Sequence, residues 1–216
     1  MAAAVAAIGI VASYGADKTR NIRVAGNITE VSAAVGVRIV YIPSATQSVV
    51  LTAPDNMIDN VTVSFREGRL KAEYDNKGNS KSSNIGDITV TVKARSVTDF
   101  KAAVGSSIIV QGTINASGKS LEFDSSVGSQ ITATGIVADK IEAEASTGSS
   151  VKLKEISVRK VEAESSTGST ITLSGTAGYA DLESSTGSSI NAGSLRANSG
   201  EIDEDITSSI ESNINK

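Results

Sequence analysis

The chain of 216 residues contains no cysteine, no histidine and no tryptophan. Without cysteine, neither a disulfide framework nor a thiolate metal site can form. Without histidine, the chain lacks the usual general base of hydrolase triads and the commonest zinc ligand. Aromatic residues make up only 3% of the chain, whereas hydrophobic residues make up 39%. We therefore expect a core of valine, isoleucine, leucine and alanine.

The chain has only two prolines but 19 glycines, a balance that favours short strands joined by tight bends. The net charge of −4 is unevenly spread. Residues 1–110 carry 12 basic against 9 acidic side chains, and residues 111–216 carry 8 against 15. An acidic second half with few aromatic side chains is a poor surface for nucleic acid, so no nucleic-acid partner is expected.

The first dozen residues are apolar and mostly small, which is typical of the hydrophobic part of a secretory signal. We expect a truncated signal segment over residues 1–15, with Ser13 and Gly15 as small residues near a cleavage site. The alternative is a disordered or strand-forming N-terminus. The apolar run is shorter than the ~20 residues that span a bilayer, so no transmembrane span is expected.

One motif recurs through the second half of the chain. Its glycines are Gly105, Gly128, Gly148, Gly168 and Gly187, which are separated by 23, 20, 20 and 19 residues. A nearly constant step of about 20 residues is the length of one coil of a solenoid.

Between these glycines the hydrophobic pattern alternates with the period of a β-strand. The apolar positions are seven and five residues before the glycine and three and five residues after it. Within the four most regular repeats these positions hold Leu121, Ile141, Val161 and Ala180; Phe123, Ala143, Ala163 and Leu182; Ile131, Val151, Ile171 and Ile190; and Ala133, Leu153, Leu173 and Ala192. The sequence therefore predicts an all-β fold, a single-stranded right-handed β-solenoid (β-helix) with ~20-residue coils.

The solenoid domain is expected to cover residues 16–200, with regular coils over about 99–195 and a less regular β-rich N-terminal part. Val35-Gly36-Val37 looks like a degenerate copy of the motif, and Glu67-Gly68 sits where a hairpin would turn. The N-terminal part is either a longer-loop continuation of the solenoid, which we favour, or a small capping sheet. Residues 201–216 leave the pattern and predict an acidic C-terminal cap or tail.

The Ser-Ser-Thr-Gly-Ser-Ser-Ile coils resemble those of one known family when they are taken with Asn21-Ile-Arg-Val-Ala-Gly26 and Glu67-Gly-Arg-Leu-Lys71. It is the "putative auto-transporter adhesin, head GIN domain" family of secreted and envelope proteins in Bacteroidetes. The resemblance covers residues 21–200. It implies a β-helical fold, an exported protein in the periplasm, at the cell surface or outside the cell, and an adhesin role.

Two series of acidic residues flank the inward positions. They comprise Glu122, Glu142, Glu162 and Asp181, and Asp124, Glu144, Glu164 and Glu183. If the coils stack in register, like charges lie ~4.8 Å apart, and a bound cation would relieve their repulsion. Glu142, Glu144, Glu162 and Glu164 are therefore candidate Ca²⁺ ligands. The alternative is an ordinary solvated face, partly neutralised by neighbouring lysines.

The same carboxylates are conceivable as the acid and base of a polysaccharide hydrolase, but none has the apolar, aromatic surroundings that would raise its pKa. No catalytic residue, and no cofactor other than calcium, is predicted. The serines flanking each glycine are interpreted as turn ladders, or alternatively as a glycan-binding strip.

The function expected from the sequence is an exported, non-catalytic surface or envelope protein that binds a glycan or another surface protein. The alternatives are a structural spacer without a ligand and, third, a polysaccharide-acting enzyme. A broad, flat, uncharged strip would favour binding, whereas a uniformly charged exterior would favour the spacer.

Overall fold

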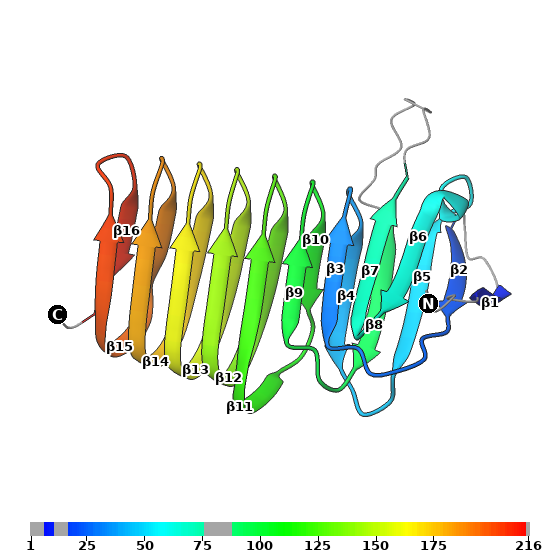
Figure 1. Cartoon of the computed structure of the whole chain (residues 1–216), viewed down its shortest axis with the longest axis horizontal. Coiled ribbons are helices and arrows are strands. Elements are labelled where there is room, and N and C mark those ends of the chain that lie inside the picture. The colour runs from blue at the N-terminus through cyan, green and yellow to red at the C-terminus, as the bar shows by residue number, and fades with distance from the viewer. Residues whose placement is uncertain (1–6, 11–16, 76–87, 215–216) are drawn as a thin grey trace.

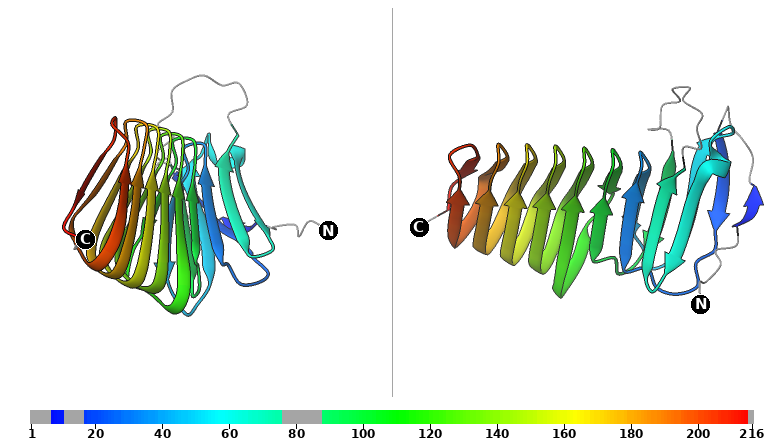
Figure 2. Two further views of the ribbon diagram at one scale, coloured as in Figure 1. Left: turned by 60° about the vertical axis from the view of Figure 1, so that its left-hand side comes forward. Right: turned by 45° about the horizontal axis from the view of Figure 1, so that its top comes forward.

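The computed structural model describes residues 7–10, 17–75 and 88–214. The chain forms an all-β solenoid whose flattened coils stack along one long axis (Figure 1). Viewed obliquely to that axis, the coils superpose into two facing layers joined by tight turns (Figure 2). The β-solenoid prediction is thus confirmed, while the right-handed sense of the winding stays a prediction.

One layer consists of the strand segments that precede each tight turn, and we call it the pre-turn sheet. Its neighbouring segments from the regular coils are parallel and in register, as in the pairing of Glu142 with Glu162. In spatial order its members are β6 (Val61–Arg66), β7 (Arg69–Tyr74), β3 (Glu30–Ala34), β9 (Asp99–Ala102) and the later parts of β11 (Ile114–Ser125), β12 (Gln130–Ala145), β13 (Ser150–Ser165), β14 (Thr170–Ser184) and β15 (Ser189–Glu204).

The other layer, the post-turn sheet, consists of the segments that follow each turn. In spatial order its members are β1 (Ala7–Ile10), β2 (Asp17–Ile22), β5 (Ser48–Pro54), β8 (Thr89–Ala94), β4 (Arg38–Pro43), β10 (Ser107–Val110), the early parts of β12 to β15, and β16 (Ser209–Ser212). A short 3₁₀ helix, η1 (Ile58–Asn60), leads into β6.

The core lies between the two sheets. All sixteen apolar positions predicted to point inward are buried, with exposed fractions of 3% or less. The core also holds a cluster of three aromatic rings that contact one another. Phe100 stacks on Phe123 with ring centroids 5.0 Å apart, and Tyr41 lies 5.4 Å from Phe100. These rings are inside the core, so they offer no outward platform for a ligand.

Each tight turn that contains a motif glycine places two successive residues in the left-handed region. In one coil these are Thr147, with φ of 52°, and Gly148, with φ of 68°. A β-branched residue is disfavoured there, yet the turn gains a hydrogen bond along the axis. The Gly148 N–H donates to the carbonyl oxygen of Thr167 in the next coil over 3.0 Å. The same contact recurs from coil to coil and forms a ladder along the turn edge.

The N-terminal half combines both predicted possibilities. β3 and β4 form a coil whose turn contains Gly36, and the Gly36 N–H donates to the Val104 carbonyl oxygen of the neighbouring coil. β5 and β6 instead pair antiparallel with β8 and β7, and Glu67-Gly68 forms the expected hairpin turn. The spatial order also differs from the chain order, because the β3–β4 coil lies between β7–β8 and β9–β10.

The two ends refine the predicted boundaries. At the C-terminus the pattern continues past residue 201, because Glu201–Glu204 belong to β15 and pair with Asp181–Ser184. A further turn leads into β16, which pairs with the start of β15. Residues 201–212 therefore include a last coil, and their role as an acidic cap stays a prediction. The predicted signal segment, residues 1–15, lies outside the described residues except for β1.

Candidate functional site

Buried serine hydroxyls join the coils at the turns. The Ser149 hydroxyl donates to the carbonyl oxygen of Ser125 in the preceding coil over 2.6 Å, and it accepts the backbone N–H of Ser146 over 3.0 Å. The residues in equivalent positions are Ser106, Ser129, Ser169 and Ser188, which are all buried. This serine column holds the turns together and is not exposed to a ligand.

The outer side of the pre-turn sheet carries two stacked columns of carboxylates. The first acidic column comprises Glu30, Asp99, Glu122, Glu142, Glu162, Asp181 and Glu201. The second acidic column comprises Asp124, Glu144, Glu164, Glu183 and Asp203. Sequence reasoning missed four of these residues because they lie outside the four most regular repeats, namely Glu30, Asp99, Glu201 and Asp203. We call the outer side of this sheet the acidic face.

Lysines neutralise much of the first acidic column. The Lys140 ammonium contacts the carboxylates of both Glu142 and Glu162, and Lys160 also pairs with Glu162 over 2.5 Å. Hydrogen bonds from these two lysines hold the pKa of Glu162 below its ordinary value. Next to them, the Lys160 ammonium lies 5.4 Å from the ring centroid of Tyr179.

The second acidic column has no such partners. In the described part of the chain none of its five carboxylates forms an ion pair. Partial desolvation of an otherwise exposed side chain, followed by the charges of Asp124 and Glu164, raises the pKa of Glu144. Burial likewise raises the pKa of Asp124. The carboxylates of the first column are therefore largely paired with lysines and those of the second column are not, although both columns look alike in the sequence.

The four predicted calcium ligands do come together. Glu142, Glu144, Glu162 and Glu164 line one shallow depression of about 340 Å³ on the acidic face. A second depression continues beside it toward the C-terminal coil. Among residues 7–10, 17–75 and 88–214, however, no three carboxylates converge in an arrangement that could hold a metal ion. Calcium binding stays a prediction.

The outer side of the post-turn sheet has a different chemistry, and we call it the hydroxyl face. Its first column comprises Thr19, Thr52, Thr89, Arg38, Ser107, Gln130, Ser150, Thr170, Ser189 and Ser209. Its second column comprises Asn21, Val50, Thr91, Val40, Ile109, Thr132, Lys152, Thr172, Asn191 and Glu211. Only Arg38, Lys152 and Glu211 of these residues are charged.

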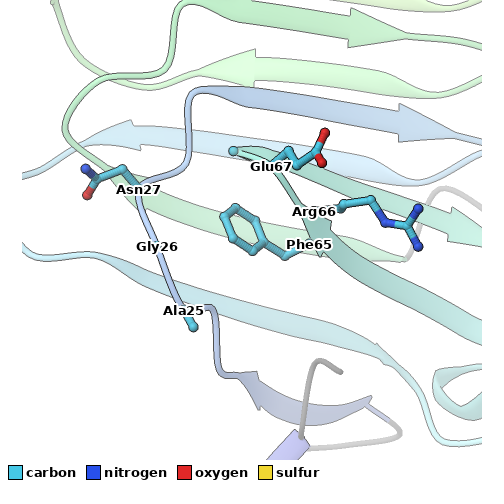
Figure 3. Close-up of a pocket in the computed structure, with 7 residues that line it drawn as sticks. Ala25, Gly26, Asn27, Phe65, Arg66 and Glu67 are labelled. Atoms are coloured by element: carbon cyan, nitrogen blue, oxygen red, sulfur yellow. The ribbon is translucent and has the colours of Figure 1, made fainter. Parts of the chain in front are cut away.

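A further hollow, of about 350 Å³, lies beside the β6–β7 hairpin at the N-terminal end. Figure 3 shows the Phe65 ring pointing toward Gly26, while the Arg66 side chain extends away from it. The ring packs closely there, since a Cβ on Gly26 would lie 3.4 Å from it. Sequence reasoning did not find this hollow, because only folding brings Gly26 and Phe65 together.

No helix in the described residues has the length and apolar character needed to cross a membrane. No curated protein matches the chain. The sequence family described as "Putative auto-transporter adhesin, head GIN domain" matches residues 27–215.

Solved structures with similar folds include three from Parabacteroides and Bacteroides species. A "putative lipid binding protein" from Parabacteroides distasonis is 15% identical, with a TM-score of 0.73 over 93% of this chain and 96% of that one. A "putative adhesin" from Parabacteroides merdae is 16% identical, with a TM-score of 0.72 over 88% and 78%. Another from Bacteroides fragilis is 18% identical, with a TM-score of 0.62 over 94% and 83%. These likenesses concern the fold alone, whereas the family match spans most of the sequence. The chain belongs to the family described as "Putative auto-transporter adhesin, head GIN domain".

Proposed function

We propose that the protein is an exported, non-catalytic surface protein that binds a glycan or another surface protein through its hydroxyl face. The observation that carries this proposal is the contrast between the two outer faces. The acidic face carries two columns made almost wholly of carboxylates, whereas the two columns of the hydroxyl face hold only three charged residues over ten strands.

The chemistry of the hydroxyl face suits a binding surface. Charged residues are depleted at the centres of protein interfaces because their desolvation is costly. Threonine, valine and isoleucine are stiff at χ1 and lose little conformational freedom when they are covered. Threonine and serine hydroxyls donate and accept hydrogen bonds, so the face can match the hydroxyls of a glycan or the edge groups of a protein.

The alternatives find less support. A spacer without a ligand needs no uncharged face, and a uniformly charged exterior would keep it soluble. A polysaccharide hydrolase needs a carboxylic acid in an apolar setting, but Glu144 of the second acidic column is exposed and has other carboxylates around it. The related structure described as lipid binding offers lipid as a further ligand class to test.

The test compares two double variants of equal charge. Thr132→Glu with Thr172→Glu adds two charges to the hydroxyl face. Ser157→Glu with Thr176→Glu adds two charges to exposed positions at the bend between the sheets. All proteins are applied to a glycan array and to immobilised lipids. Binding that is lost only in the face variant supports the proposal. Equal loss in both variants overturns it, because the hydroxyl face would then not carry the binding.

A further inference from the structure

The pre-turn sheet ends in an unpaired strand edge on both sides. In the part of the chain that the structure describes, β6 pairs only with β7, and no strand covers the outer side of Glu201–Glu204 in β15. Figure 1 shows these two edges at opposite ends of the molecule. Such edges present free backbone N–H and C=O groups to any strand that approaches them.

Apolar side chains accompany both edges. At the C-terminal end Ile202, Ile210 and Ile214 are only partly buried. At the N-terminal end Val63 is partly buried, and Phe65 borders the hollow of about 350 Å³. Apolar side chains of the core are therefore only partly shielded from solvent at both ends of the solenoid.

The strand edges at the two ends carry different charges. At the N-terminal end β6 carries one basic side chain, Arg66, which is exposed, has no ion-pair partner among the described residues and extends away from Gly26 (Figure 3), while Glu67 in the following turn is exposed beside it. At the C-terminal end Glu201, Asp203 and Asp205 are exposed. Contact between two C-terminal ends would bring like charges together, whereas contact between unlike ends pairs opposite charges.

The register of the sheet fits a contact between unlike ends. Arg66 and Glu201 occupy the two ends of one outward column, because Arg66 faces Arg69 and Glu201 faces Asp181. Phe65 and Ile202 likewise occupy the two ends of one inward column, through Leu70 and Leu182. If β15 of one copy lay beside β6 of another, it would pair antiparallel. Glu201 would then face Arg66, and Ile202 would face Phe65.

We propose that the C-terminal coil of one copy binds the β6 edge of a second copy, so that chains associate end to end. The occupant of each edge is thus a second copy of this chain. Because the two contacting surfaces differ, the contact is heterologous, and it can repeat along a row of molecules. The proposal concerns the ends of the solenoid and is independent of what the hydroxyl face binds.

The experiment uses sedimentation velocity of the full chain over a range of concentrations in low salt. We expect concentration-dependent oligomers that dissociate as salt screens the charges. Arg66→Glu and Glu201→Arg should each weaken association at least about tenfold. A mixture of the two single variants should associate again, because each can offer the other a matched pair of ends. A parent chain that stays monomeric throughout overturns the proposal.

Cysteine cross-linking provides a second readout, because the chain has no cysteine of its own. A variant with Ser64→Cys and Asp203→Cys should form a ladder of covalent oligomers under oxidation, since these positions would face each other across the contact. The control carries Ser64→Cys and Glu164→Cys, with the second cysteine in the middle of the acidic face. Equal ladders from both variants would show random collision and would also overturn the proposal.

Discussion

The backbone N–H of Gly148 donates to the carbonyl oxygen of Thr167, 3.0 Å away in the next coil. This contact explains why the turns with a motif glycine keep two residues in the left-handed region. The carbonyl of the residue before the glycine must point along the solenoid axis to accept the next bond. The continuous ladder of hydrogen bonds thus offsets the local backbone strain of the turns.

The strain in the turn leads to a first prediction. Thr147 is β-branched and has φ of 52°, so Thr147→Asn should raise the free energy of unfolding by about 0.5–1 kcal/mol. Gly148→Ala should lower it by about 1 kcal/mol from backbone strain alone, because a Cβ there meets no atom within 4 Å. Urea denaturation measures both. Thr132→Asn, in an ordinary strand, is the control and should not stabilise.

The serine column gives a second prediction. Ser149→Ala removes a buried hydroxyl that both donates and accepts a hydrogen bond, and it should cost about 1–2 kcal/mol of stability. Ser146→Ala changes the same turn at a half-exposed position and should cost less than about 0.5 kcal/mol. Equal losses in thermal unfolding would mean that the buried contacts do not bind the coils together.

The two acidic columns should respond oppositely to neutralisation. The raised pKa of Glu144 means that its charged form is disfavoured in the folded state, so Glu144→Gln should stabilise the protein at pH 7. The lowered pKa of Glu162 means the reverse, so Glu162→Gln should destabilise it. Each effect should be a few tenths of a kcal/mol, roughly the size of a surface ion pair. When thermal unfolding is compared at two ionic strengths, the effect of Glu162→Gln should shrink in high salt, because salt screens the lysine pairs. The effect of Glu144→Gln should persist in large part, because its first cause is desolvation, which salt does not screen.

The last coil should loosen in acid. The Asp205 carboxylate accepts hydrogen bonds from the backbone N–H of Thr186 and from the N–H and hydroxyl of Thr207, which lower its pKa to about 2. A depressed pKa contributes stability above the unfolded value of 3.8 that disappears as the pH falls toward 2. Hydrogen exchange of Ser209–Ser212 should therefore quicken over this range beyond its intrinsic change. In Asp205→Asn the exchange should already be faster at pH 6.

Calcium binding by the acidic face is tested by thermal unfolding in EDTA and in millimolar Ca²⁺. A ligand that binds only the folded state at a hundredfold excess over its dissociation constant adds ~2.7 kcal/mol of stability. We expect the midpoint to rise in Ca²⁺ and the rise to disappear when Glu142, Glu144, Glu162 and Glu164 are all changed to Gln. An identical midpoint in EDTA and Ca²⁺ would leave the columns as a solvated face.

The regular coils could be predicted because each of their residues repeats a local rule. The glycine step placed the turns, and the alternation around it assigned positions such as Ile141 and Leu173 to the core. In-register stacking then put Glu142 above Glu162 without further information. In such a solenoid each coil contacts only the neighbouring coils, so the period of the sequence largely determines the tertiary structure.

The sequence determined by itself the fold class, the core columns and the acidic stripe, because these follow from the period of the side chains. Only the tertiary structure decided the order of the N-terminal strands, where β3–β4 lies between segments that follow it in the chain. It also decided which carboxylates acquire lysine partners, as Glu162 does and Glu164 does not. Long-range pairing of irregular strands and the reach of long side chains depend on neighbours that are distant in sequence, and no local period records them.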